Sequence, residues 1–349
     1  MRKYLCLLLA IMTVIFCTGC DKWENPELLE DQIPVVLPEP TNEEDVVRNP
    51  LTGEPLANPE TVNNRPVAVM LNNIHVAMPH HGVSEADIIY EFDVEAGITR
   101  MIGFYQDVSK VGTIGSVRSA RPYYVETVLG MDAIYVHAGG SPEAMGMIYR
   151  LDIDDIDEGS YEAFWRDAER YKTMDWEHTL MTSGERLENY LTEHGWERKH
   201  SEDFAYPFTY VEDGTPYSDT AATDISVKFS NYKTGTFTYD PETGLYMIGQ
   251  WGDPYIDGNT GEQVGVTNLL ILRTTVYNSG DSSGHMVIDV QGSDTGTYIC
   301  GGKATEITWH KETMEDPFTY TLPDGTPFSL GIGKTYVCVV DHSALVTIS

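Results

Sequence analysis

The sequence predicts an α+β protein whose C-terminal part is rich in β-structure. Between residues 65 and about 205, apolar runs of strand length alternate with segments that carry helix caps. Helical signals stop at about residue 216, and short strands separated by glycine- and proline-containing turns follow. We therefore expect an α/β domain over residues 65–215 and a β-rich, mainly antiparallel domain over residues 216–349.

Four strands are expected in the first of these domains. Residues 67–71 form a continuous apolar run, which is typical of a strand that is buried on both faces. Residues 86–95 and 99–106 form a pair of strands on either side of Ala96 and Gly97, and residues 133–137 form the fourth. The mixed pattern indicates a sheet that helices cover.

The helices of this domain are marked by their first residues. Pro122 suits the first turn of a helix that ends at Gly130, because proline has no N–H to lose there. Ser141 and Pro142 form a cap and a first turn before residues 144–151. A third helix opens at residues 182–185 and stops at Gly195.

The second domain shows only strand signals. Its turn signals include residues 240–244 and 323–325. The expected strands cover residues 224–229, 236–239, 245–248, 269–276, 286–290, 297–300, 304–309 and 336–340.

The first twenty residues predict export and lipid attachment. Arg2 and Lys3 precede an apolar run over residues 5–16, which is too short to span a membrane as a helix. The ending Cys17-Thr18-Gly19-Cys20 resembles a bacterial lipobox, so we expect residues 1–19 to be removed and Cys20 to carry diacylglycerol. The alternative is an ordinary secretory signal. The first interpretation places the protein on the extracytoplasmic face of the cell membrane.

Residues 20–64 have the composition of a tether. The segment contains seven prolines and many acidic residues without a sustained apolar period. Such a tether would hold the folded body away from the lipid headgroups. Residues 49–53 could instead fold onto the body.

The net charge bears on the binding partners of the protein, and the cysteine content bears on disulfide formation. The 349-residue chain has 22 basic and 54 acidic residues and a net charge of −32, which argues against nucleic acid as a partner. Besides the leader cysteines and Cys20, the chain contains Cys300 and Cys338. Both lie in strand-like runs, and in an exported protein they could form a disulfide or remain as two buried thiols.

Clustered arginines stand out in so acidic a chain. Arg118 and Arg121 lie three residues apart in a loop that leads into the helix at Pro122, and Arg100 lies in a preceding strand. Guanidinium groups at a helix N-terminus suit a carboxylate or phosphate ligand. The alternative is internal pairing with carboxylates, for which the strand-like run before Arg100 offers Asp87, Glu91 and Glu95.

An enzyme is the second hypothesis for this domain. His137 ends a strand before a glycine pair, and His178 follows an acidic segment. Together with Asp87 or Glu91 they could act as acid and base. Histidines at such positions are more often hydrogen-bonded core residues. No spacing typical of a metal site and no glycine-rich phosphate loop is present, so we expect neither metal nor cofactor.

Aromatic residues next to charged ones form another candidate site. Trp165 and Arg166 lie in the run Phe164-Trp165-Arg166-Asp167, a combination found in grooves for sugars or peptides and equally in the walls of a core. Nucleophile motifs such as GxSxG are absent, which favours a non-catalytic role.

Several separated motifs in order resemble the YerB-like lipoproteins of Gram-positive bacteria, a family of unknown function. The resemblance covers about residues 63–345 and implies a layered sandwich of two sheets and helices in a membrane-anchored extracytoplasmic protein. It implies no activity. The motifs are Arg65-Pro66-Val67-Ala68-Val69-Met70, Ala86-Asp87-Ile88-Ile89-Tyr90-Glu91, Gly97-Ile98-Thr99-Arg100, Gly115-Ser116-Val117-Arg118-Ser119-Ala120-Arg121, His137-Ala138-Gly139-Gly140-Ser141-Pro142, Gly265-Val266-Thr267-Asn268 and Gly333-Lys334-Thr335-Tyr336.

Three functional hypotheses follow. The preferred one is a non-catalytic envelope lipoprotein that binds an anionic or peptide-like ligand. The second is a wall-directed hydrolase or transferase, and the third is a scaffold whose β-rich domain binds a partner protein. The residues expected to contact the ligand are Arg100, Arg118, Arg121, His137, Trp165 and Arg166; those of the catalytic alternative are Asp87, Glu91, His137 and His178.

Overall fold

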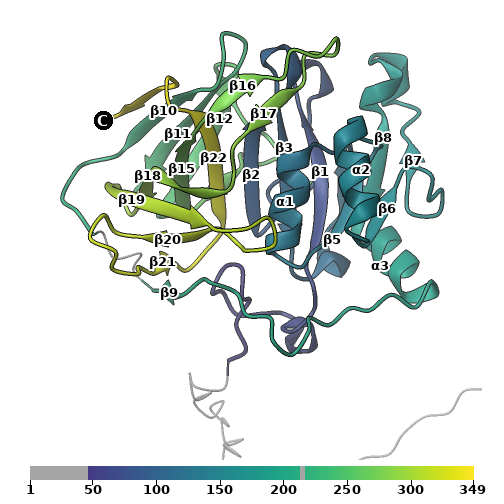
Figure 1. The fold of residues 1–349 in the computed structure, drawn as a ribbon, viewed down its shortest axis with the longest axis horizontal. Coiled ribbons are helices and arrows are strands. Elements are labelled where there is room, and N and C mark those ends of the chain that lie inside the picture. Colours follow the sequence, from purple (N-terminus) through teal and green to yellow (C-terminus); the bar gives the residue numbers. More distant parts are fainter. Residues whose placement is uncertain (1–45, 213–216) are drawn as a thin grey trace, which may run out of the picture. The chain divides into compact units, whose positions relative to one another are not determined.

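A ten-stranded mixed sheet forms the centre of the protein in a computed structural model, which describes residues 46–212 and 217–349 (Figure 1). The expected export signal, Cys20 and the tether up to residue 45 lie outside the described residues. In spatial order the strands are β20 (Thr319–Thr321), β19 (Lys303–Lys311), β18 (Gly292–Cys300), β15 (Asn268–Thr274), β22 (Thr335–Asp341), β2 (Ile88–Asp93), β3 (Thr99–Tyr105), β1 (Val67–Asn73), β5 (Ile134–His137) and β6 (Asp155–Asp157).

Both halves of the sequence contribute to this sheet. β22, from the C-terminal half, pairs in parallel with β2, from the N-terminal half, in the register Ile88↔Thr335 to Phe92↔Val339. The expected boundary at residues 215–216 therefore lies between two segments that share one sheet. β2 and β22, which pair at this point of the sheet, are buried along almost their whole length, and burial on both faces explains why their sequences are continuous apolar runs.

Helices cover one face of the sheet. α1 (Pro122–Gly130) and α2 (Pro142–Arg150) lie side by side in front of it (Figure 1) and pack on side chains such as Ala68 and Met70. The expected serine cap is confirmed, because the Ser141 hydroxyl accepts a hydrogen bond from the Ala144 N–H at 3.2 Å.

The opposite face is covered mainly by a second sheet. β10 (Asp224–Lys228), β11 (Thr234–Asp240) and β12 (Leu245–Gln250) turn alternate side chains such as Val227 and Phe237 toward it. The sheet also contains β13 (Asp253–Pro254), β14 (Gly265–Val266) and β23 (Leu345–Ile348). The predicted α+β fold and the layered sandwich implied by the resemblance are confirmed.

Smaller elements complete the body. α3 (Gly184–Glu193) packs on the same face as the second sheet through Leu187 and Leu191. The remaining paired strands are β4 (Thr113–Gly115), β7 (Trp165–Arg166), β8 (Leu180–Ser183), β9 (Tyr210–Val211), β16 (Val276–Asn278), β17 (Met286–Ile288) and β21 (Leu330–Gly331). Short 3-10 turns are η2 (Pro59–Thr61), η3 (His75–Ala77), η4 (Glu95–Gly97), η5 (Val108–Lys110), η6 (Arg170–Lys172) and η7 (Trp176–His178). Within the described part of the chain, none of the helices has the length and apolar character needed to cross a membrane.

The last part of the expected tether folds onto the body. Leu51 and Thr52 are fully buried. The Asn49 amide donates a hydrogen bond to the Asp87 carboxylate at 2.8 Å. The interpretation in which residues 49–53 join the body is therefore confirmed.

Of the two alternatives left open for Cys300 and Cys338, the structure contradicts the disulfide. Cys300 on β18 and Cys338 on β22 are not bonded to each other. β15 lies between the two strands, so their backbones are two strand spacings apart, ~10 Å, whereas a disulfide needs Cα atoms within ~7 Å. In addition, the two side chains belong to core clusters on opposite faces of the sheet.

Candidate functional site

The loops at one edge of the central sheet meet where three parallel strands end. β1, β5 and β6 run in the same direction, and in sheets of this kind ligands bind outside the carboxyl ends of the strands. The loop before α1 and the loop before α2 are tied together here: the Ala120 N–H donates to the Gly139 carbonyl at 2.9 Å, and the Ala138 N–H donates to the Arg118 carbonyl at 3.0 Å. This edge therefore has a fixed backbone framework.

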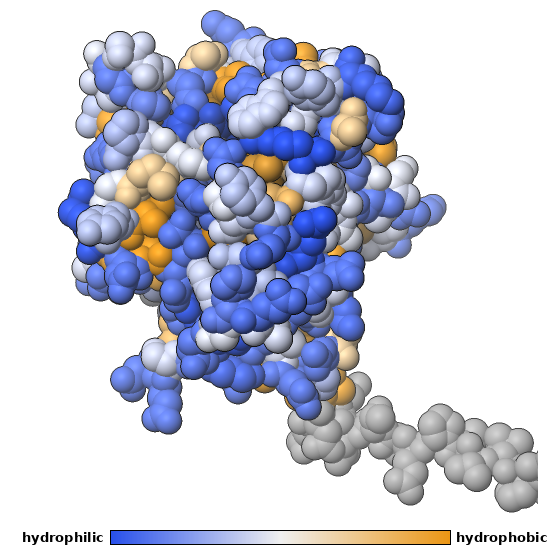
Figure 2. Space-filling view, turned by 90° about the vertical axis from the view of Figure 1, so that its right-hand side faces the viewer, coloured by the Kyte–Doolittle hydropathy of each residue, from blue (hydrophilic) through white to orange (hydrophobic). Residues whose placement is uncertain are grey.

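A cleft of about 430 Å³ lies beside the end of β6, and we call it the Trp176 cleft. Tyr161 and Trp176 are respectively 86% and 56% exposed, which is unusual for large aromatic side chains. Figure 2 shows the side of the molecule that carries β7 and β8, where hollows with hydrophobic side chains interrupt a mostly hydrophilic surface. The lining residues are Glu158, Gly159, Tyr161, Phe164, Trp165, Arg166, Trp176 and Leu180.

Arg166 organises this cleft. Its guanidinium carbon lies 3.4 Å from the centre of a Trp176 ring, and its Nη2 lies 2.9 Å from a Glu158 carboxylate oxygen. Arg166 also donates to the Trp176 carbonyl at 3.0 Å. The cleft thus offers aromatic surface next to a positive and a negative group that neutralise each other.

Three arginines hold the η7 turn that carries Trp176. Its carbonyls accept hydrogen bonds in succession: Trp176 from Arg166, Glu177 from Arg118, and His178 from Arg170. Arg118 also pairs with the Glu177 carboxylate at 3.1 Å. A turn held at three successive carbonyls presents the indole in a defined position.

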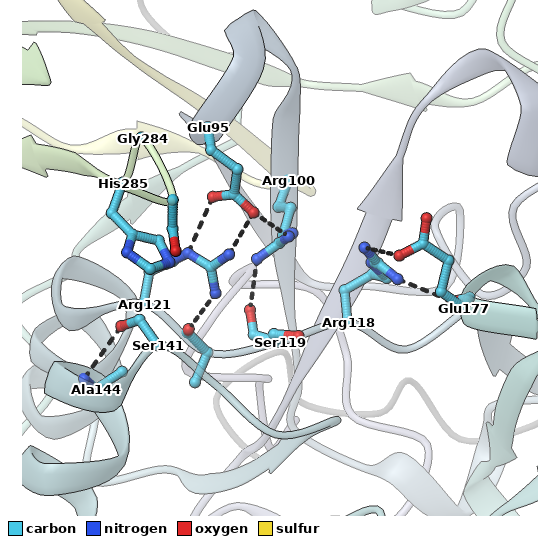
Figure 3. Close-up of polar contacts among 12 residues, drawn as sticks. Glu95, Arg100, Arg118, Ser119, Arg121, Ser141, Ala144, Glu177, Gly284 and His285 are labelled. Atoms are coloured by element: carbon cyan, nitrogen blue, oxygen red, sulfur yellow. Dashed lines mark hydrogen bonds and ion pairs between the residues drawn. The ribbon is translucent and has the colours of Figure 1, made fainter. Parts of the chain in front are cut away.

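The other two predicted binding arginines lie inside the fold. Arg100 and Arg121 converge on the carboxylate of Glu95 (Figure 3). The Arg100 Nη2 is 2.7 Å from Glu95 Oε1, and the Arg121 Nε is 3.1 Å from Oε2. We call these three residues the Glu95 cluster. The η4 turn places Glu95 beside Arg100 of the same hairpin, and Arg121 immediately precedes α1.

Burial and charge in the Glu95 cluster act in opposite directions. Burial favours a neutral Glu95, but Arg100 and Arg121 outweigh it and lower the pKa of this carboxyl to about 2. Burial together with Arg121 lowers the pKa of Arg100 to about 10, so this group still carries its charge at neutral pH. The Arg100 and Arg121 side chains are only 3% and 6% exposed. The two guanidinium groups therefore share one carboxylate inside the fold, and the Glu95 cluster keeps a formal charge of +1.

The residues of the catalytic alternative do not form one site, because they lie apart in the structure. Glu91 points to the face of the sheet that also carries Ile89, whereas His137 points to the face of Tyr135. Both are buried, and His137 lies between the Gly139 carbonyl and the Asp155 carboxylate at 2.9 and 3.0 Å. The structure does not bring Glu91 and His137 together.

The remaining two residues of that alternative have local partners. Burial raises the pKa of Asp87 to about 6, although the Gln106 N–H and the Asn49 amide donate to its carboxylate. Burial and Arg118 lower the pKa of His178, whose Nδ1 lies 3.0 Å from the Asn72 amide nitrogen. Over residues 46–212 and 217–349, no three His, Cys, Asp or Glu side chains are grouped to hold a metal ion.

A larger hollow of about 740 Å³ lies at the other end of the same parallel strands. Arg65 and Asp132 pair there at 3.3 Å, and His200 lies 2.7 Å from the same aspartate. Because this hollow is at the amino ends of β1 and β5 and its charged groups pair with one another, the Trp176 cleft is the better candidate site.

Sequence reasoning identified Trp165 and Arg166 but not the whole cleft. Glu158, Tyr161 and Trp176 were missed, as was Arg170, which holds the η7 turn. The available signal was the density of aromatic residues among charged ones between residues 161 and 176. Their convergence depends on irregular turns, which a periodic pattern does not reveal.

Comparisons with known proteins agree with the fold. Residues 51–197 match the N-terminal domain, and residues 225–337 the C-terminal domain, of the family described as "Protein of unknown function (DUF3048)". The Bacillus subtilis (strain 168) protein named "Putative lipoprotein YerB" is 27% identical over 307 residues, which span 87% of this chain and 89% of that protein. A crystal structure of the YerB protein from Bacillus subtilis has a TM-score of 0.74 and 25% identity, and the match covers 86% of this chain and 99% of that chain. The resemblance found in the sequence is confirmed, and the chain belongs to the DUF3048 family.

Proposed function

We propose that this protein is a lipoprotein, anchored to the extracytoplasmic face of the membrane through Cys20, whose folded body binds a peptide-like envelope ligand in the Trp176 cleft. The name of the Bacillus subtilis relative supports the anchor. The leader and the lipobox-like sequence before Cys20 support it independently. The observation that carries the binding proposal is the pair of exposed aromatic side chains, Tyr161 and Trp176, in a concave site beside Arg166 and Glu158.

The charge balance of the cleft favours a peptide over a simple anion. Arg166 is paired with Glu158 and Arg118 with Glu177, so no cationic excess faces the cleft. A peptide supplies carbonyl or carboxylate oxygens for a guanidinium and N–H groups for a carboxylate. Its side chains and methyl groups pack on aromatic faces. These features match both the charged pair and the aromatic surface.

Calorimetric titration of the full-length lipoprotein in detergent, with short synthetic peptides of the bacterial wall stem as probes, tests this function. Trp176→Ala and Tyr161→Ala should weaken binding about tenfold or more, as expected for central aromatic anchors. Tyr149→Ala is the matched control, because Tyr149 is 88% exposed and lies outside the lining of the cleft. Equal binding by all four proteins would contradict the assignment of the cleft, and absence of binding to the wild type would reject stem peptides as the ligand class.

The anchor is tested separately. Cells that express the wild-type protein should incorporate labelled fatty acid into it, and the Cys20→Ala protein should carry no label and leave the membrane fraction. Unchanged labelling of Cys20→Ala would contradict lipidation at this residue.

A further inference from the structure

A lysine is fully buried between the two large sheets. Lys233, in the turn between β10 and β11, has a side chain that is 0% exposed. Its Nζ lies 2.5 Å from Oε1 of Gln250 and 3.1 Å from Oε1 of Glu91. The ring of Trp251 lies 4.9 Å from the same nitrogen. A lone buried ammonium group is costly, so this arrangement calls for an explanation.

The amide of Gln250 is in position to react with this lysine. Gln250 is 3% exposed, and the pairing of β11 with β12 places it opposite Gly235, two residues after Lys233. Because a carbonyl bond is about 1.2 Å long, the amide carbon of Gln250 lies within about 3.7 Å of Nζ. This separation is close to that of reacting atoms held in a productive pose. Within the described part of the chain, the Gln250 Nε2 has no hydrogen-bond partner.

Glu91 is held rigidly at the other side of the lysine. It is 1% exposed, and its carboxylate accepts hydrogen bonds from Asn73 at 2.7 Å, Thr99 at 2.5 Å and Tyr336 at 2.6 Å. The glutamate comes from β2 of the central sheet, whereas Lys233 directly precedes β11 and Gln250 ends β12 of the second sheet. Packing of the two sheets thus brings together an amine, an amide and a carboxylate away from water.

The surroundings favour the uncharged amine that a nucleophile requires. Burial lowers the pKa of Lys233, and the attraction of Glu91 only partly opposes this. Transfer of one proton from the ammonium to the adjacent carboxylate removes both charges from the dry interior. The amine is then next to the amide carbon.

We propose that Lys233 and Gln250 form an intramolecular isopeptide bond, with Glu91 as the group that moves protons. Glu91 first takes one proton from the ammonium of Lys233. The Nζ lone pair attacks the amide carbon of Gln250, and a second Nζ proton passes through Glu91 to the leaving Nε2. The bond between the amide carbon and Nε2 breaks, ammonia leaves, and the new bond joins Nζ to that carbon. No oxidant, reductant or other reagent is consumed.

Tryptic peptide mapping of the denatured full-length protein tests this bond. Trypsin cannot cleave after an acylated lysine, and residues 234–272 contain no other lysine or arginine. We expect one peptide over residues 229–273, lighter than its sequence by one ammonia, with fragment ions that locate the branch at Lys233 and Gln250. Recovery of the separate peptide over residues 229–233, or of an uncleaved peptide with its full mass, would overturn the proposal.

Variants separate the roles of the three residues. Glu91→Gln and Lys233→Met should abolish the mass loss, whereas Lys303→Gln, at a lysine that is hydrogen-bonded to the Asp219 carbonyl on the surface, should retain it. The wild-type peptide decides the question even where a variant fails to fold. Loss of water with a branch at Glu91 would also contradict the proposal, because Glu91 would then be the acceptor.

Discussion

Arginine has opposite roles in the Glu95 cluster and the Trp176 cleft. In the Glu95 cluster, Arg100 and Arg121 share one carboxylate and are almost fully buried. In the cleft, Arg166 has a 29% exposed side chain and lies against an exposed indole. Clustering of arginines in an acidic sequence therefore does not by itself identify a binding loop. What each guanidinium group can contact depends on how deeply it is buried and on which carboxylate it is paired with.

The largest expected effect comes from removing the shared carboxylate. Glu95→Ala leaves two buried guanidinium groups without their partner, and we expect the free energy of unfolding to fall by about 3 kcal/mol or more. Urea denaturation measures this change. Glu177→Ala is the matched control, because this half-exposed partner of Arg118 should cost less than about 1 kcal/mol. An equal decrease in the free energy of unfolding for Glu95→Ala and Glu177→Ala would contradict the claim that the Glu95 cluster is structural and the Arg118–Glu177 pair is not.

The ionised carboxylate of Glu95 should also make the free energy of unfolding depend on pH. Because the pKa of Glu95 is lowered from 4.5 to about 2 in the folded protein, its ionised form stabilises the fold above about pH 4.5. This contribution is lost as the pH falls toward about 2. The stability difference between wild type and Glu95→Gln, measured by urea denaturation at several pH values, should therefore shrink over this range. A difference that stays constant would mean that Glu95 is not held ionised by the arginines.

In the cleft, the expected effect is on binding. Arg166→Met keeps an apolar stem but removes the charged donor beside Trp176, and we expect stem peptides to bind about tenfold more weakly. Calorimetric titration measures this change. Lys172→Met serves as a control, since the side chain of this lysine is 64% exposed and pairs with the neighbouring Glu169. Wild-type affinity in Arg166→Met would show that the guanidinium does not contact the ligand.

The smallest effect is expected at Arg118. Its carboxylate partner Glu177 is half exposed, so Arg118→Ala should lower the free energy of unfolding by less than about 1 kcal/mol. Because Arg118 holds the turn that carries Trp176, a modest loss of peptide affinity should accompany this change. A large loss of stability without any loss of affinity would place Arg118 with the Glu95 cluster.

Local signals in the sequence predicted the elements better than their assembly. The capped helix after Ser141 and the apolar strand at residues 67–71 depend on neighbouring residues and were predicted correctly. The pairing of β2 with β22 joins residues almost 250 positions apart, and no local pattern specifies it. The choice between a disulfide and two buried thiols at Cys300 and Cys338 stayed open for the same reason, because it required knowledge of strand order and of the face on which each side chain lies.

In the candidate site, too, residue types could be identified from the sequence, whereas their long-range contacts could not. Glu95 was among the carboxylates considered as partners of the arginines, but only the η4 turn brings it to both Arg100 and Arg121. Trp176 went unrecognised because its position depends on hydrogen bonds from Arg166, Arg118 and Arg170 to a short turn. Partners distant in sequence, rather than residue types, determine which groups face a ligand.

The most direct test of the central claim is a titration of one stem peptide into wild type, Trp176→Ala and Glu95→Gln under conditions in which all three are folded. The account predicts equal affinity for wild type and Glu95→Gln and at least about tenfold weaker binding by Trp176→Ala. Loss of binding in Glu95→Gln with full binding in Trp176→Ala would contradict it and assign the ligand to the Glu95 cluster.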